Sequence, residues 1–187
     1  MTLEEMIKKV LRLIEEFNPN HKDLTDDPDI ATKMKDVINQ VMYELARLKK
    51  IPRYIEFDVT EGETIDFARI ENECGSEVYQ VCKVSGVKHE CKAQNTIIKV
   101  LESGTIEIEL YIYPERITSS TNAKIYEFEL SPDVLEIMPY GVASDLLKSD
   151  ISAEYGKIYS QRYEEMIQRV DSRYNMPSIS YEGGVNF

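Results

Sequence analysis

The chain has 187 residues, of which 42% are hydrophobic and 30% are charged, as is typical of a soluble globular protein. Its net charge is −12, and more than half of that negative excess falls within residues 53–130. Such a surface repels phosphate groups, and no basic patch interleaved with aromatic residues offsets it. The composition therefore argues against ordinary DNA or RNA binding.

Residues 1–52 predict two amphipathic helices. Thr2 and Glu5 form a capping-box pattern, and Asp27 followed by Pro28 predicts the start of the second helix, which Pro52 ends. Charged residues interrupt the first helix, so it is neither a signal peptide nor a membrane span. The first apolar stripe is Leu3, Met6, Ile7, Val10, Leu11, Ile14 and Phe17, and the second is Ile30, Met34, Val37, Ile38, Val41, Met42, Leu45 and Leu48.

Residues 53–130 alternate between apolar and polar side chains, which predicts short strands. Ile106 to Ile112 give the clearest pattern, with Ile and Leu facing one way and Glu107 and Glu109 facing the other. Six strands with tight turns and one apolar face predict an antiparallel β-sandwich or small barrel. The expected strands are 53–59, 64–67, 78–84, 96–101, 105–113 and 124–130.

Residues 131–171 predict two more helices. Ser131 and Pro132 favour a helix start, and the short link at Ser149 and Asp150 favours an antiparallel hairpin. The apolar stripe of the first helix is Val134, Leu135, Met138, Val142, Leu146 and Leu147, and that of the second is Tyr155, Ile158, Tyr159, Tyr163, Met166, Ile167 and Val170.

Residues 174–187 carry many large apolar side chains for a terminal segment, while Pro177 and the Gly183-Gly184 pair disfavour a helix. One interpretation is a frayed end, or one that folds back on its own domain. The other is an arm that becomes ordered on another protein chain. In the second case the partner-binding residues are Tyr174, Met176, Ile179, Tyr181, Val185 and Phe187.

The sequence contains no recognised catalytic or nucleotide-binding motif, and no catalytic residue is predicted. Cys74, Cys82 and Cys91 fall in the strand-rich middle with His89, but without the paired spacing of a zinc site. An odd number of cysteines argues against a disulfide framework and for a reducing compartment. We expect no metal and no cofactor.

The predicted fold is α+β, with an antiparallel four-helix domain of two helical hairpins, an inserted antiparallel β-sandwich or barrel, and an extended C-terminal arm. The helical domain comprises residues 1–52 and 131–173, the β domain residues 53–130, and the arm residues 174–187. This order resembles the head-to-tail connector (adaptor) proteins of tailed double-stranded DNA bacteriophages. The resemblance is carried by residues 28–52, by Met138-Pro139-Tyr140 and the helix around it, and by Gln161 to Glu165.

The resemblance implies a structural protein of the virion, assembled in the host cytoplasm and not an enzyme. Family members form a ring of about a dozen copies that joins the portal of the head to the tail proteins. DNA would pass through the channel without specific binding, and no membrane is involved. The alternatives are a stopper or tail-completion protein of the same virion, an acid-dependent hydrolase, and a protein-interaction module outside phages.

Overall fold

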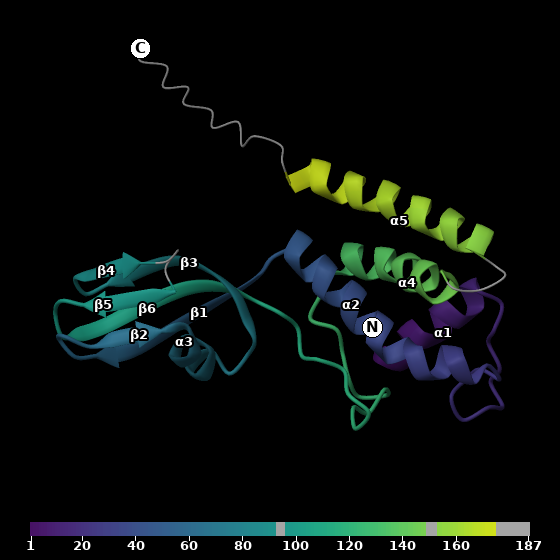
Figure 1. Cartoon of the computed structure of the whole chain (residues 1–187), viewed down its shortest axis with the longest axis horizontal. Coiled ribbons are helices and arrows are strands. Elements are labelled where there is room, and N and C mark those ends of the chain that lie inside the picture. The colour runs from purple at the N-terminus through teal and green to yellow at the C-terminus, as the bar shows by residue number, and fades with distance from the viewer. Residues whose placement is uncertain (93–95, 149–152, 175–187) are drawn as a thin grey trace, which may run out of the picture.

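A computed structural model describes residues 1–92, 96–148 and 153–174 (Figure 1). Its elements, in chain order, are α1 (Leu3–Leu13), α2 (Pro28–Leu48), β1 (Ile51–Val59), β2 (Thr64–Asp66), α3 (Phe67–Cys74), β3 (Val78–Gly86), β4 (His89–Lys92), β5 (Ile97–Val100), β6 (Gly104–Ile112), α4 (Pro132–Leu147) and α5 (Ala153–Tyr174). We call α1, α2, α4 and α5 the helical part, and residues 51–112 the β part. The expected α+β class is confirmed.

The first two helices begin where the sequence predicts. Thr2 caps α1 through the complete capping box with Glu5, and the Asp27 side chain accepts hydrogen bonds from the first turn of α2. Helix α1 ends at Leu13, earlier than its apolar stripe implies. Ile14 and Phe17 nonetheless pack against the helical core from the segment that follows.

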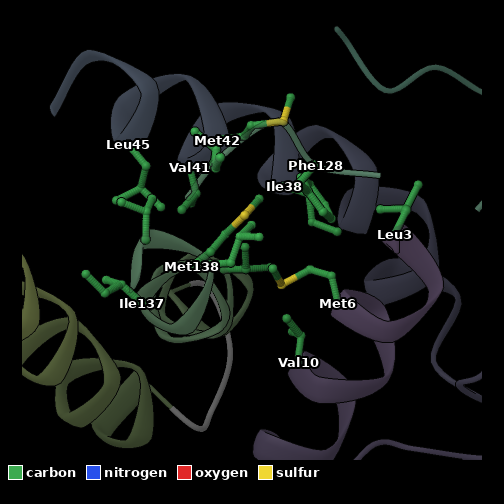
Figure 2. Close-up of a cluster of buried hydrophobic side chains, with 14 of the residues drawn as sticks. Leu3, Met6, Val10, Ile38, Val41, Met42, Leu45, Phe128, Ile137 and Met138 are labelled. Carbon is green, nitrogen blue, oxygen red and sulfur yellow. The ribbon is translucent and has the colours of Figure 1, made fainter. Parts of the chain in front are cut away.

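Helix α4 is the centre of the helical part. It is buried nearly all round, as expected of a helix without a polar face, and α1, α2 and α5 all pack against it. Figure 2 shows Met138 of α4 lying between Met6 of α1 and the α2 side chains Val41 and Met42. Helices α4 and α5 run side by side in opposite directions, as the predicted second hairpin requires (Figure 1).

The β part consists of two three-stranded antiparallel sheets, with strand orders β1-β6-β3 and β2-β5-β4. Both sheets and α3 contribute to one hydrophobic cluster. The described strands form no closed barrel, so the barrel alternative was wrong. The predicted inward face of β6 is confirmed, because Ile106, Ile108, Leu110 and Ile112 are all fully buried. The β1–β6 ladder starts with Ile51 opposite Ile112.

Three local predictions were wrong. The segment 124–130 is not a strand, because its one bridge pairs Glu127 with Thr2, directly before α1 begins. Helix α3, a fifth helix among the described residues, was not predicted. It follows β2, and the Asp66 side chain caps its start. Gly75 ends it with a backbone φ of 66°, in the left-handed region that glycine adopts readily. Strand β4 lies outside the six expected strands, between the third and the fourth of them.

Four tyrosines join α2 to the β part. The rings of Tyr43 and Tyr113 stack with centroids 4.5 Å apart, and the Tyr79 ring lies 4.9 Å from that of Tyr113 and 6.0 Å from that of Tyr111. The Tyr79 hydroxyl donates to the Ala46 carbonyl of α2 over 3.2 Å. Burial, followed by the neighbouring tyrosines, raises the pKa of Tyr79 to about 12. We call these four residues the tyrosine joint.

Candidate interaction surfaces

The predicted partner-binding residues fall at the edge of the described structure. Tyr174 is the last residue of α5, and its side chain is not described. Met176, Ile179, Tyr181, Val185 and Phe187 lie outside the described residues. The candidate surfaces that the structure does describe lie elsewhere, on the helical part and on one sheet face.

Helix α5 does not bury the whole apolar stripe that its sequence predicts. Tyr163 and Val170 are buried, but Tyr155 and Ile158 are 63% and 61% exposed. Because α5 packs mainly on α4, only its inner side is covered. Two large apolar side chains therefore remain in solvent near the start of α5. A single exposed apolar residue needs no explanation. An adjacent pair on one helix face indicates a contact surface.

A groove lies between α1 and α5, with α4 as its floor. It contains two cavities, of about 440 Å³ and about 230 Å³, which share Leu13. The Tyr159 hydroxyl of α5 donates to the Leu13 carbonyl and so connects the two walls. The larger cavity is lined by Lys9, Arg12, Leu13, Glu136, Pro139, Tyr140 and Met166. We call the whole groove, with both cavities, the α1–α5 groove.

On the other side of α5, a cleft of about 520 Å³ separates α5 from α2, again above α4. Its walls carry the carboxylates of Glu44, Asp145 and Glu164, and Lys148 is ion-paired with Asp145. Tyr163 reaches into it from α5 and is only 9% exposed. We call this site the α2–α5 cleft.

The position of Tyr163 depends on a glycine in α4. The nearest ring atom, Cε2, lies 2.8 Å from where a Cβ on Gly141 would be, and Val41 Cγ1 lies 3.0 Å from the same point. The absence of a side chain at Gly141 therefore lets the ring lie against the α4 backbone. Burial, and then the negative charge of Glu44, raises the pKa of Tyr163 well above its ordinary value, so the hydroxyl stays protonated at neutral pH.

The solvent face of the β1-β6-β3 sheet is mainly acidic, with one lysine, Lys83 of β3, opposite Glu109 of β6. Glu56 on β1 lies directly opposite Glu107 on β6, and Tyr54 lies opposite Glu109, whose carboxylate accepts a hydrogen bond of 3.4 Å from the tyrosine hydroxyl. Asp58 extends the same row on β1, opposite Thr105. Like charges directly across a ladder repel each other, so this face carries a local cost in stability. We call Glu56, Asp58, Glu107 and Glu109 the acidic face.

The cysteines do not gather around His89. Cys91 is exposed, Cys74 and Cys82 are half-buried, and the His89 ring nitrogen Nδ1 lies 2.7 Å from the Val87 carbonyl. Within residues 1–92, 96–148 and 153–174, no three or more His, Cys, Asp or Glu side chains form a group that could hold a metal ion. Over the same residues, no helix combines the length and the apolar character needed to cross a membrane.

The α2–α5 cleft and the α1–α5 groove were not predicted from the sequence. One signal was available: Gly141 interrupts the otherwise large side chains of an apolar helix, which indicates close approach of a neighbouring element. Which element approaches depends on tertiary packing. No protein-family model matches the chain, and no curated protein shows significant sequence similarity to it.

Proposed function

We propose that this protein is a subunit of a head-to-tail connector (adaptor) ring of a tailed double-stranded DNA bacteriophage. The observation that carries the proposal is the insertion of the acidic β part between α2 and α4, so that it stands beside the helical part (Figure 1). That is the arrangement which the resemblance of the helical sequences to connector proteins implies.

Ring formation needs two different surfaces on each subunit, because neighbours in a cyclic ring meet head to tail. The helical part offers two candidate surfaces, one on α5 itself and one in the groove between α5 and α1. Tyr155 and Ile158 are exposed apolar side chains on α5, and the α1–α5 groove is an apolar recess with Pro139 and Met166 in its lining. Surfaces of this kind are uncommon on proteins that act alone, and they suit contacts with adjacent copies.

The tyrosine joint supports a role in which the β part is held at a fixed angle. Tyr43 on α2 stacks on Tyr113 immediately after β6, and the Arg47 guanidinium lies 5.3 Å from the Tyr113 ring centroid. Aromatic stacking and cation–π contacts of this sort each contribute about 1 kcal/mol. A rigid connection between the two parts is what repeated subunits of one ring require.

The acidic face suits a channel wall. A wall of carboxylates repels the DNA backbone, so the genome slides past it without adhering. In the proposed ring, Glu56, Asp58, Glu107 and Glu109 face the lumen. The C-terminal arm, residues 174–187, reaches the portal, where its apolar side chains gain an ordered environment on docking. Many weak arms acting together give strong attachment through multivalency.

The test is reconstitution with the portal ring encoded by the same phage. The full chain and a variant lacking residues 175–187, which keeps α5 intact, are each mixed with purified portal rings and imaged by negative stain. The proposal expects a second ring on the portal with the full chain and its loss with the shortened chain. Circular dichroism of both proteins checks that the deletion leaves the helical content in place.

A parallel mixture with the tail-completion proteins separates the two virion roles. Binding there and not to the portal would assign the chain to the stopper, on the tail side of the joint. If the full chain binds neither assembly, the connector role is excluded, and a protein-interaction module of another kind takes its place.

A further inference from the structure

We propose that residues 175–187 of this chain bind in the α1–α5 groove of the same subunit before that subunit joins an assembly. The inference concerns the free subunit, so it goes beyond the connector role and does not depend on it. Three observations carry it: a mainly apolar cavity in the groove, the place where the described chain ends, and unpaired positive charges on the rim of the cavity.

The larger cavity of the α1–α5 groove is the first observation. Its volume of about 440 Å³ lies within the range of sites that take up a ligand, about 300–1,000 Å³. Leu13, Pro139, Tyr140 and Met166 give it a mainly apolar lining. Tyr140 and Met166 are only half-buried, so covering them would remove further apolar surface from water. The cavity therefore offers a site for apolar side chains of another segment.

The position of the last described residue is the second observation. Helix α5 ends at Tyr174, eight residues after Met166 in the wall of the groove. At 1.5 Å per residue, the two lie about 12 Å apart along the helix axis. Residues 175–187 span up to about 45 Å when fully extended, and about four of them suffice to return to the level of Met166. The remaining residues are enough to follow the groove.

The composition of residues 175–187 matches the lining of the groove. Their large apolar side chains are spread along the segment, so several of them can enter the groove together. Burial of such side chains is favourable in proportion to the apolar area that leaves water. These side chains are Met176, Ile179, Tyr181, Val185 and Phe187.

The charge on the rim of the larger cavity is the third observation. Lys9 and Arg12 of α1 line the cavity, and within the described residues neither has an ion pair. Glu136 is the one carboxylate among the described lining residues, so the rim is positive in a chain whose net charge is −12. Residues 175–187 carry one charged side chain, Glu182. The segment and the rim are therefore complementary in charge.

Covalent attachment favours the groove of the same subunit over that of a second copy. A short linker holds a segment near its site at an effective concentration in the millimolar range, above that of separate copies in dilute solution. In the connector role, the contact would also keep the groove closed to an adjacent copy until the portal binds the segment. That consequence rests on the proposed function, whereas the contact itself is tested on the subunit alone.

The experiment compares amide chemical shifts of the ¹⁵N-labelled full chain with those of a chain that ends at Tyr174. We expect differences at residues 9–13 and at Glu136, Tyr140 and Met166, and we expect them to persist on dilution. Thermal unfolding by circular dichroism checks that both chains fold alike. If the chains differ only beside Tyr174, the proposal is wrong. If the differences disappear on dilution, the segment binds a second copy, and the assignment to the same subunit is wrong.

A synthetic peptide of residues 175–187, capped at both ends, tests the site by competition. It should shift the same amides of the shortened chain, with a dissociation constant of about 0.1 mM. It should bind the full chain about tenfold more weakly, because the attached segment competes at an effective concentration of about 1 mM. A scrambled peptide of the same composition should bind the shortened chain at least about fivefold more weakly than the native peptide. Equal binding of the native peptide to both chains, or equal binding of the two peptides, would overturn the proposal.

Variants of the shortened chain localise the contact. Lys9→Glu should weaken peptide binding about threefold, as expected of an exposed charge contact, and the effect should diminish at high salt. Lys33→Glu is the matched control, because it makes the same charge change at an exposed residue of α2 that lines neither cavity. Met166→Ala removes apolar lining and should weaken binding about fivefold. If Lys9→Glu and Lys33→Glu have equal effects, or if Met166→Ala leaves binding unchanged, the groove is not the site.

Discussion

Asn39 and Ile117 exchange two buried hydrogen bonds. The Asn39 side-chain amide donates to the Ile117 carbonyl over 2.7 Å, and the Ile117 backbone N–H donates to the Asn39 carbonyl oxygen over 2.8 Å. Asn39 is only 6% exposed and lies on the buried side of α2. The Asn39 amide therefore satisfies the backbone N–H and carbonyl of Ile117, as a neighbouring strand would do in a sheet. These two bonds attach the irregular segment between β6 and α4 to the helical core.

Substituting Asn39 by Ala should destabilise the protein by about 3 kcal/mol, because it leaves both the N–H and the carbonyl of Ile117 buried without partners. Urea unfolding monitored by circular dichroism measures the loss. Gln40→Ala, at the exposed neighbouring position of α2, is the control and should cost less than about 0.5 kcal/mol. Similar costs for the two variants would mean that the Asn39 pair contributes little.

Gly141→Ala should destabilise the helical part by about 1–2 kcal/mol. Alanine is the better helix former, but its Cβ would lie 2.8 Å from the Tyr163 ring and force α5 away from α4. Gly156→Ala is the matched comparison, because its Cβ would meet the nearest atom, Leu147 Cβ, at 3.3 Å, and its cost should be smaller.

A double-mutant cycle identifies the source of the Gly141 effect. In a Tyr163→Ala background the ring is gone, so the further change Gly141→Ala should cost much less in thermal unfolding. An equal cost with and without the ring would instead assign the strain to Val41, which is the other close neighbour.

The ion pair between Lys49 and Asp133 should contribute stability that disappears in acid. It joins the end of α2 to the first turn of α4 with an N–O distance of 2.7 Å. Burial acts to raise the pKa of Asp133, but the hydrogen bonds and positive charge of Lys49 outweigh it and lower the pKa from 3.8 to about 2. Between these values the unfolded state binds more protons than the folded state, so stability falls as the pH falls from about 4 toward 2.

Lys49→Met tests this pH dependence. The side chains of the pair are about one-quarter to one-third exposed, so we expect the variant to lose only about 1 kcal/mol at pH 7. The difference from the unsubstituted protein should shrink as the pH falls below 4, in urea titrations at a series of pH values. A constant difference from pH 7 to pH 2 would show that the methylene packing of Lys49, and not its charge, is responsible.

Glu56→Lys should stabilise the β part by about 0.5 kcal/mol at low salt, because an opposite-charge pair replaces the repulsive pair that faces Glu107 across the ladder. The gain should diminish in 0.5 M NaCl through screening. Glu102→Lys, on the exposed turn before β6, serves as the control for net charge alone. A gain of equal size there would mean that general charge reduction explains the effect.

The sequence predicts the elements whose signals are local. Capping at Thr2 and Asp27 located α1 and α2, and the alternation from Ile106 to Ile112 located β6 with the correct inward face. Prediction from the sequence failed where a segment pairs with residues that are distant along the chain. Residues 124–130 alternate like a strand, but their neighbour is the N-terminus, which turns into α1 after a single bridge.

The candidate surfaces were less predictable than the fold. Helical spacing placed Tyr155 and Ile158 on the same stripe as Tyr163, yet the packing of α5 on α4 covers only part of that stripe. Helical periodicity shows on which side of its own helix a side chain lies, but not how much of that side a neighbouring helix covers. The predicted arm residues beyond Tyr174 lie outside the described structure and remain a prediction.

The pairing of Ile51 with Ile112 has a consequence for how this chain could have acquired its β part. The polypeptide enters that part at Ile51 and leaves it at Ile112, and these residues face each other on the first rung of the β1–β6 ladder. A segment whose two ends meet in this way can be exchanged for another of different length or shape without separating the ends of the helices that flank it.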